Sequence, residues 1–243
     1  MEKKQTFHFQ KGEVLLVNKP LDWTSFDVVN KLRYTIIKTL GIRKRKIKIG
    51  HAGTLDPKAT GLLIICVGKQ TKSIETYQGH EKEYTGVIRL GASRPSFDIE
   101  TEIDQTFDLS PLTEANILET RKQFVGTFEQ AAPIFSALKV NGKRMYKHAR
   151  KGRDIAPKIR TVEVSAFDIP KIELPDVHFR IACGKGTYIR SIAHDFGKAL
   201  NNGGYLNGLC RIRIGDYHLH DAWDLDELVK VIQNMPVPLS PQP

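Results

Sequence analysis

The chain has 243 residues, of which 40% are hydrophobic, enough to bury one large domain or two small ones. It has no apolar run of the roughly 18 residues that span a bilayer, and its N-terminus lacks the apolar core of a signal peptide. The net charge of +10 favours a polyanionic partner, and three widely spaced cysteines without metal-ligand spacing indicate reduced thiols. We therefore expect a cytoplasmic protein with no membrane association.

The first quarter of the chain predicts a strand, a helix and then a loop. The strand is expected at residues 12–17. Thr24 and Asp27 fit a capping box that opens the helix. A basic cluster follows at 43–48, and a loop over 48–61 then enters an apolar stretch at 62–67. The periodicity of the helix places five apolar residues on one inner face: Phe26, Val29, Leu32, Ile36 and Leu40.

From residue 84 onward, strands and helices are mixed without a regular βαβ rhythm. The pattern predicts strands at 84–90, 162–167 and 177–183, and helices at 113–124, after a glycine turn at 184–186, and at 224–235. This order indicates an α+β fold with a mixed, largely antiparallel sheet and flanking helices. We expect a single domain over 1–235, an inserted arm at about 131–160, and a frayed proline-rich tail at 236–243.

The segment 139–160 is rich in lysine and arginine and almost without acids. It also contains the aromatic Tyr146 and two glycines, Gly142 and Gly152. Such a segment is either a solvated helix face with a basic loop or a flexible arm that grips nucleic acid. The aromatic residue, the glycines and the charge together favour the arm.

Asp56 is the only carboxylate between Lys48 and Gln70, and it stands in a Gly-Thr-Leu-Asp-Pro turn. An aspartate in such a turn is usually a turn former, but the apolar stretch behind it and the basic cluster before it favour a chemical role. A hard cation needs several oxygen ligands, and glycosidase chemistry needs a second acid; neither lies nearby. A nucleophilic carboxylate is the remaining use, and it needs a fixed cation, for which Arg190 is the best candidate.

The motif Gly50–Leu63 resembles the active-site motif of the bacterial TruB-type tRNA pseudouridine-55 synthases. Four further motifs occur in the family's order. They are Leu16–Pro20 with Thr24-Ser25, Lys82–Gly91, Pro133–Arg150, and Gly184–Arg190 followed by Leu209 and Arg211. Segment 93–98 departs from the family's Thr-Asp-Thr-like pattern and keeps only Asp98, and Asp22 stands where glycine is frequent. The resemblance implies a pseudouridine synthase fold of the short form, without a C-terminal PUA domain.

The resemblance also implies a reaction and residue roles. A uracil in the T-loop of tRNA would be flipped out, detached, rotated and rejoined through carbon, without metal or organic cofactor. Asp56 would be the nucleophile, Tyr84 the stacking residue and proton acceptor, and Arg190 the partner of Asp56. The implied RNA-binding residues are His51, which holds the RNA loop open, Leu209, which packs on the flipped base, and Lys19, Lys139, Tyr146, Arg150, Tyr188 and Arg211.

Two alternative hypotheses follow from the same residues. One is the catalytic subunit of a guide-RNA-dependent pseudouridine synthase, which shares the Gly-Thr-Leu-Asp-Pro loop; the short C-terminus and the long insertion favour a stand-alone enzyme instead. The other is a non-catalytic tRNA-folding chaperone; the presence of both Asp56 and Arg190 favours catalysis. The expected partner is the T-arm of tRNA, bound by a monomer with no obligate protein partner.

Overall fold

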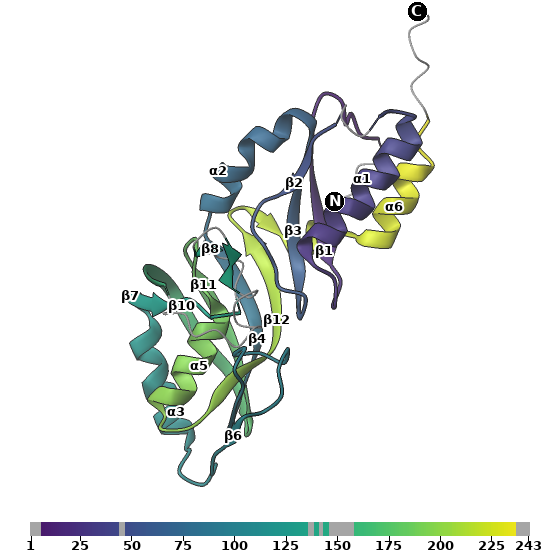
Figure 1. Cartoon of the computed structure of the whole chain (residues 1–243). Helices are drawn as coiled ribbons and strands as arrows, with labels where there is room; N and C mark the ends of the chain where they lie inside the picture. The colour runs from purple at the N-terminus through teal and green to yellow at the C-terminus, as the bar shows by residue number, and fades with distance from the viewer. Residues whose placement is uncertain (1–5, 44–46, 136–138, 141–142, 146–157, 237–243) are drawn as a thin grey trace, which may run out of the picture. The chain divides into compact units, whose positions relative to one another are not determined.

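The computed structural model describes residues 6–43, 47–135, 139–140, 143–145 and 158–236. The chain divides into two compact units, Met1–His80 with Cys210–Pro243, and Glu81–Leu209 (Figure 1). Strand β12 (Gly204–Ile214) begins in the second unit and ends in the first. No helix within the described ranges is both long and apolar enough to cross a bilayer.

The first unit is built on a sheet centred on β1 (Glu13–Lys19) and β3 (Ala59–Val67), which pair antiparallel along their whole length. Strand order is β14–β1–β3–β12, with β14 (Trp223–Asp224) parallel to β1. Short elements complete the unit: β2 (Ile49–His51), which pairs with β3, β13 (Tyr217–His218), which pairs with β12, α2 (Ile74–Gly79), and the 3₁₀ turns Gly68–Ser73 and Leu219–Asp221.

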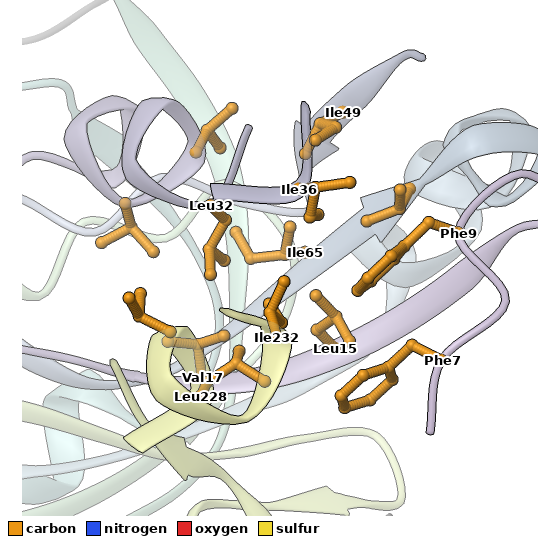
Figure 2. Close-up of a cluster of buried hydrophobic side chains, with 14 of the residues drawn as sticks. Phe7, Phe9, Leu15, Val17, Leu32, Ile36, Ile49, Ile65, Leu228 and Ile232 are labelled. Carbon is orange, nitrogen blue, oxygen red and sulfur yellow. The ribbon is translucent and has the colours of Figure 1, made fainter. Parts of the chain in front are cut away.

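Both faces of β3 are buried, which explains its unbroken apolar sequence. One face joins a hydrophobic cluster with α1 (Ser25–Leu40) and α6 (Leu225–Gln233), which pack against each other (Figures 1 and 2). Successive side chains of a strand alternate between faces, so a strand buried on both sides shows no polar alternation. The residues facing these helices are Leu63, Ile65 and Val67, and those in the cluster on the other face are Leu62, Ile64 and Cys66.

Helix α1 begins at the predicted capping box. Thr24 Oγ1 accepts from the Asp27 N–H at 3.0 Å, and the Asp27 carboxylate accepts from the Thr24 N–H at 2.9 Å. The helix ends at Gly41, whose φ of 62° is left-handed. The predicted inner face was wrong at Phe26, whose side chain is 58% exposed. The buried stripe instead follows Val28, Val29, Leu32 and Ile36, and Phe26 lies outside it in the first turn.

The second unit is an antiparallel sheet covered by helices. Its strand order is β12–β4–β11–β10–β7, formed by β4 (Lys82–Leu90), β11 (Asp176–Cys183), β10 (Ile159–Glu173) and β7 (Gly126–Ala131). The helices are α3 (Glu114–Thr120), the 3₁₀ turn Arg121–Phe124 and α5 (Ile189–Ala199), and short pairs are β5 (Ala92–Ser93) with β6 (Gln105–Thr106) and β8 (Lys139–Val140) with β9 (Lys143–Arg144).

Aromatic rings join the helices of the second unit to its sheet. Phe124 and Phe196 from the helical side contact each other, and Phe196 contacts Phe167 of β10. Phe167 in turn contacts Phe179 of β11. The predicted α+β class, with mixed and largely antiparallel pairing, is confirmed.

Candidate active site

Asp56 lies half-buried in the loop that joins β2 to β3 in the first unit. The loop is tied to β3 at both ends. The Ala52 N–H donates to the Ile64 carbonyl at 2.9 Å, and the Ala59 N–H donates to the Asp56 carbonyl at 3.1 Å. Since eight of the nine residues of β3 are buried, these bonds fix the loop to a strand of the unit's core.

Ser25, the first residue of α1, holds the residue that precedes Asp56. Its buried Oγ accepts from the Leu55 N–H at 2.8 Å and donates to the Leu55 carbonyl at 3.0 Å. Both backbone polar groups of Leu55 are thus satisfied away from water, as buried backbone requires. The backbone position of Asp56 is therefore coupled to the start of α1.

Lys19, at the end of β1, has no exposed surface and supports the same loop. Its Nζ donates to the carbonyls of Pro20 at 2.8 Å, Trp23 at 2.6 Å and Pro57 at 3.4 Å. Burial lowers the pKa of Lys19 to about 8, against the opposing effect of Asp56. The ammonium therefore interacts electrostatically with Asp56 and stabilises the negative charge that a carboxylate nucleophile needs.

Asp22 lies in a turn that contacts the residue after Asp56. Its φ of 65° lies in the left-handed region, which aspartate tolerates better than most residues. Its N–H donates to the Pro57 carbonyl at 2.9 Å, and its carboxylate pairs with Lys58 Nζ at 2.6 Å. This turn is a further support on the C-terminal side of Asp56.

Arg211 and His51 complete the group around the loop. The buried Arg211 donates from Nε to the Leu62 carbonyl at 2.8 Å and from Nη2 to the Gly53 carbonyl at 3.2 Å. Burial lowers the pKa of His51, and the charge of Arg211 acts in the same direction. The first unit thus brings together four of the predicted site residues, Asp56, Lys19, His51 and Arg211. The RNA-binding roles of the latter three stay predictions.

Arg190 lies in the first turn of α5 in the second unit and is 4% exposed. Its Nη1 donates to the Ser96 carbonyl at 3.2 Å and lies 3.4 Å from the Asp98 carboxylate, and its Nη2 donates to the Phe135 carbonyl at 3.0 Å. A buried guanidinium requires such compensation. The pairing of Arg190 with Asp56 joins residues of different units and stays a prediction.

Asp98 is a functional candidate that sequence reasoning missed. Its side chain is 6% exposed and it pairs with Arg190, while its carboxylate also accepts from the Glu100 N–H at 2.9 Å. A signal was present, because Asp98 is the one residue of segment 93–98 that keeps the family pattern. Ser25 was likewise quoted within a motif without being given a role.

The other predicted residues of the second unit are on its strands and at the start of α5. Tyr84 pairs with Ile181 across β4 and β11 and is 9% exposed, and Leu209 is half-buried on β12. Tyr188 precedes α5, and its ring centroid lies 5.1 Å from the guanidinium carbon of Arg160, a cation–π contact. Their roles toward a base or RNA stay predictions.

The predicted RNA-binding arm is described only in part. Lys139 begins β8, which pairs with β9. Tyr146 and Arg150 lie outside the described residues, so the roles of all three remain predictions. Within the described ranges, no three histidine, cysteine, aspartate or glutamate side chains are grouped in a way that could hold a metal ion.

Comparison with known proteins identifies the family. Residues 38–189 match the model of the TruB family pseudouridylate synthase (N terminal domain). The tRNA pseudouridine synthase B of Flavobacterium johnsoniae is 54% identical over 217 residues, which cover 89% of this chain and 94% of that protein. The protein of the same name from Phocaeicola vulgatus is 50% identical over 219 residues, with coverage of 90% and 92%.

A solved structure has a fold similar to that of this chain. A chain of a Cbf5-Nop10-Gar1 complex superposes with a TM-score of 0.66 at 29% identity. The match covers 92% of the present chain and 55% of that one, so the chain spans about half the length of this structural relative. The family model matches more than half of this chain, and the two bacterial relatives match most of it. The chain therefore belongs to the TruB family of pseudouridylate synthases.

Proposed function

We propose that this pseudouridine synthase acts on tRNA, at the T-loop uridine, with Asp56 as the nucleophile. The observation that carries the proposal is the lone carboxylate of Asp56 on a loop fixed by Ser25, Lys19 and Arg211. The names of the relatives support tRNA as the substrate. The excess of positive charge suits a polyanionic substrate as well.

The reaction requires the target base to leave its stack. A uridine in a folded loop cannot be rotated in place, and flipping it out costs roughly a few kcal/mol. Stacking on an aromatic side chain returns about 1–3 kcal/mol per base, and Tyr84 is the residue we assign to it. The bond between uracil N1 and the sugar then breaks, the base turns while it is held, and a bond from C5 to the sugar forms. The C5 hydrogen leaves as a proton and N1 takes up a proton, so the product is an isomer of uridine.

A fixed positive charge completes the proposed site. Arg190 is held by a buried carboxylate and two backbone carbonyls, so its guanidinium is oriented before substrate binds. We assign it to stabilising the Asp56 carboxylate during attack on ribose or base. Preorganised charge of this kind is among the largest sources of catalysis.

The test is tritium release from a tRNA transcript labelled at uracil C5, with purified protein and no guide RNA. We expect wild-type release, loss of it in Asp56→Asn, and wild-type release in a control, Asp216→Asn, which changes an exposed aspartate. No release by the wild type would overturn the stand-alone function and favour the guide-dependent alternative or a chaperone. Full release by Asp56→Asn would remove Asp56 from the mechanism.

The substrate fragment and the assembly state are part of the same proposal. We assign recognition to the T-arm, so an isolated T-arm hairpin should be modified at the same uridine as the full tRNA. We also infer a cytoplasmic monomer without an obligate protein partner. Sedimentation of the active enzyme, alone and with the hairpin, tests this; activity confined to a dimer would contradict it.

A further inference from the structure

The segment Ser96–Asp98 contains one half of a stack of two rings. The ring of Phe97 stacks on the imidazole of His194, with centroids 3.8 Å apart and an interplanar angle of 15°. His194 follows Arg190 by four residues on α5, so the two side chains lie on one side of that helix. The proposed catalytic arginine and the ring stack therefore share one scaffold.

The backbone of Phe97 is strained. Its φ of 64° is left-handed, a conformation that a bulky side chain rarely adopts. Such strain persists only where the surroundings over-determine it. The Phe97 N–H donates to the Arg94 carbonyl at 2.9 Å, and its carbonyl accepts from the Leu206 N–H at 2.9 Å. The stack with His194 adds a side-chain contact to these two bonds.

The strained residue separates the two groups that orient Arg190. The Ser96 carbonyl accepts from Arg190 Nη1 at 3.2 Å, and the Asp98 carboxylate lies 3.4 Å from the same nitrogen. Because Phe97 joins them covalently, a change in its backbone conformation moves both. The position of the guanidinium therefore depends on the conformation at Phe97.

The environment of His194 disfavours the charged form of its ring. Burial lowers the pKa of His194, with Lys198 acting in the same direction and Asp195 and Asp104 opposing. Its buried Nδ1 has no hydrogen-bond partner in the part of the chain that the structure describes. Packing on Phe97, rather than a hydrogen bond from Nδ1, is thus the contact that the imidazole contributes here.

We propose that His194 is a positioning residue for the reaction: by stacking on Phe97, it fixes Ser96 and Asp98 where they orient Arg190. The proposal rests on the proposed function, in which Arg190 is catalytic. It assigns a purpose to segment 93–98 in this chain, where the family pattern is otherwise absent.

The test compares variants that remove or keep the stack. His194→Ala should lower kcat about 10- to 100-fold, since small misplacements of catalytic groups have effects of this size, with KM within about twofold. His194→Phe keeps an aromatic ring and should restore kcat. The exposed His220 provides a control, because His220→Ala should match the wild type. Equal loss in His194→Ala and His194→Phe, or a change in KM alone, would overturn the proposal.

A second variant separates positioning from folding. Phe97→Gly removes the ring but relieves the left-handed strain, so it should fold as well as the wild type and still lose kcat. Combined with His194→Ala it should lose little more, because both changes remove one contact. A fully active Phe97→Gly enzyme, or strictly additive losses, would refute the stack as the positioning device.

A readout without turnover keeps this inference distinct from the proposed function. In ¹⁵N NMR spectra, the Arg190 Nε–H signal should shift or broaden in His194→Ala and Phe97→Gly and remain near its wild-type position in His194→Phe. An unchanged signal in all three variants would overturn the positioning role. If wild-type tritium release fails, the proposed function fails, and this signal still decides whether the stack orients Arg190.

Discussion

Removing the hydroxyl of Ser25 tests whether α1 positions the Asp56 loop. In Ser25→Ala, the buried N–H and carbonyl of Leu55 lose the partner that satisfies both at 2.8 and 3.0 Å. Each orphaned buried group costs about 1–3 kcal/mol, so the free energy of unfolding should fall by about 2–6 kcal/mol. Because Leu55 adjoins Asp56, kcat should fall in the fraction that remains folded.

The assay for stability is urea unfolding followed by fluorescence. Tritium release is measured without urea, at a temperature at which both proteins are folded. Ser165→Ala is the matched control, since Ser165 also bonds a backbone carbonyl, that of Ala182 at 3.2 Å, but is exposed. Exposed substitutions usually change stability by less than about 0.5 kcal/mol. A Ser25→Ala protein as stable and as active as Ser165→Ala would refute the coupling of α1 to the loop.

Three further predictions concern the same machinery. Gly61→Ala should lower the free energy of unfolding by at least about 2 kcal/mol. The φ of Gly61 is 105°, and a Cβ at this position would lie 2.4 Å from the Arg211 carbonyl oxygen. An unchanged urea midpoint would contradict this. The lowered pKa of Lys19, about 8 against 10.5, means that the unfolded chain holds this proton when the folded protein has released it. Stability should therefore gain about 3 kcal/mol from this group between pH 8 and 10.5, a rise that Lys19→Met should lack in unfolding titrations. Burial lowers the pKa values of His51 and His194, so both are protonated more readily in the unfolded state than in the folded state. The free energy of unfolding should therefore fall as the pH drops below about 6.5. If the stability of a His51→Gln/His194→Gln protein falls equally steeply with pH in this range, these histidines are not the cause.

The features that sequence predicted are those set by nearby residues. The Thr24–Asp27 capping box is a local pattern, and it marks the true start of α1. The alternation over 84–90 likewise gives β4, with Tyr84 on its buried face. The apolar run 62–67 was expected to anchor the Asp56 loop, and β3 does so through buried pairing on both sides.

Features that depend on distant contacts were beyond local reasoning. Periodicity alone wrongly placed Phe26 on the buried face of α1. Which face is buried depends on where the sheet and α6 lie, and the sequence of α1 does not specify this. The ion pair of Arg190 with Asp98 joins residues 92 positions apart, and no pattern of spacing specifies it. The support of Leu55 by Ser25 also depends on the folded approach of a helix to a loop.

The first unit is made from both ends of the chain, and this has a consequence for its synthesis. Its sheet needs β14 beside β1, and its core needs α6 against α1, yet about 130 residues of the second unit are translated between them. The second unit is continuous and can fold as it leaves the ribosome. The Asp56 loop is synthesised early, but we expect it to become ordered late. A nascent chain should hold Asp56 in its folded position only after α6 has emerged.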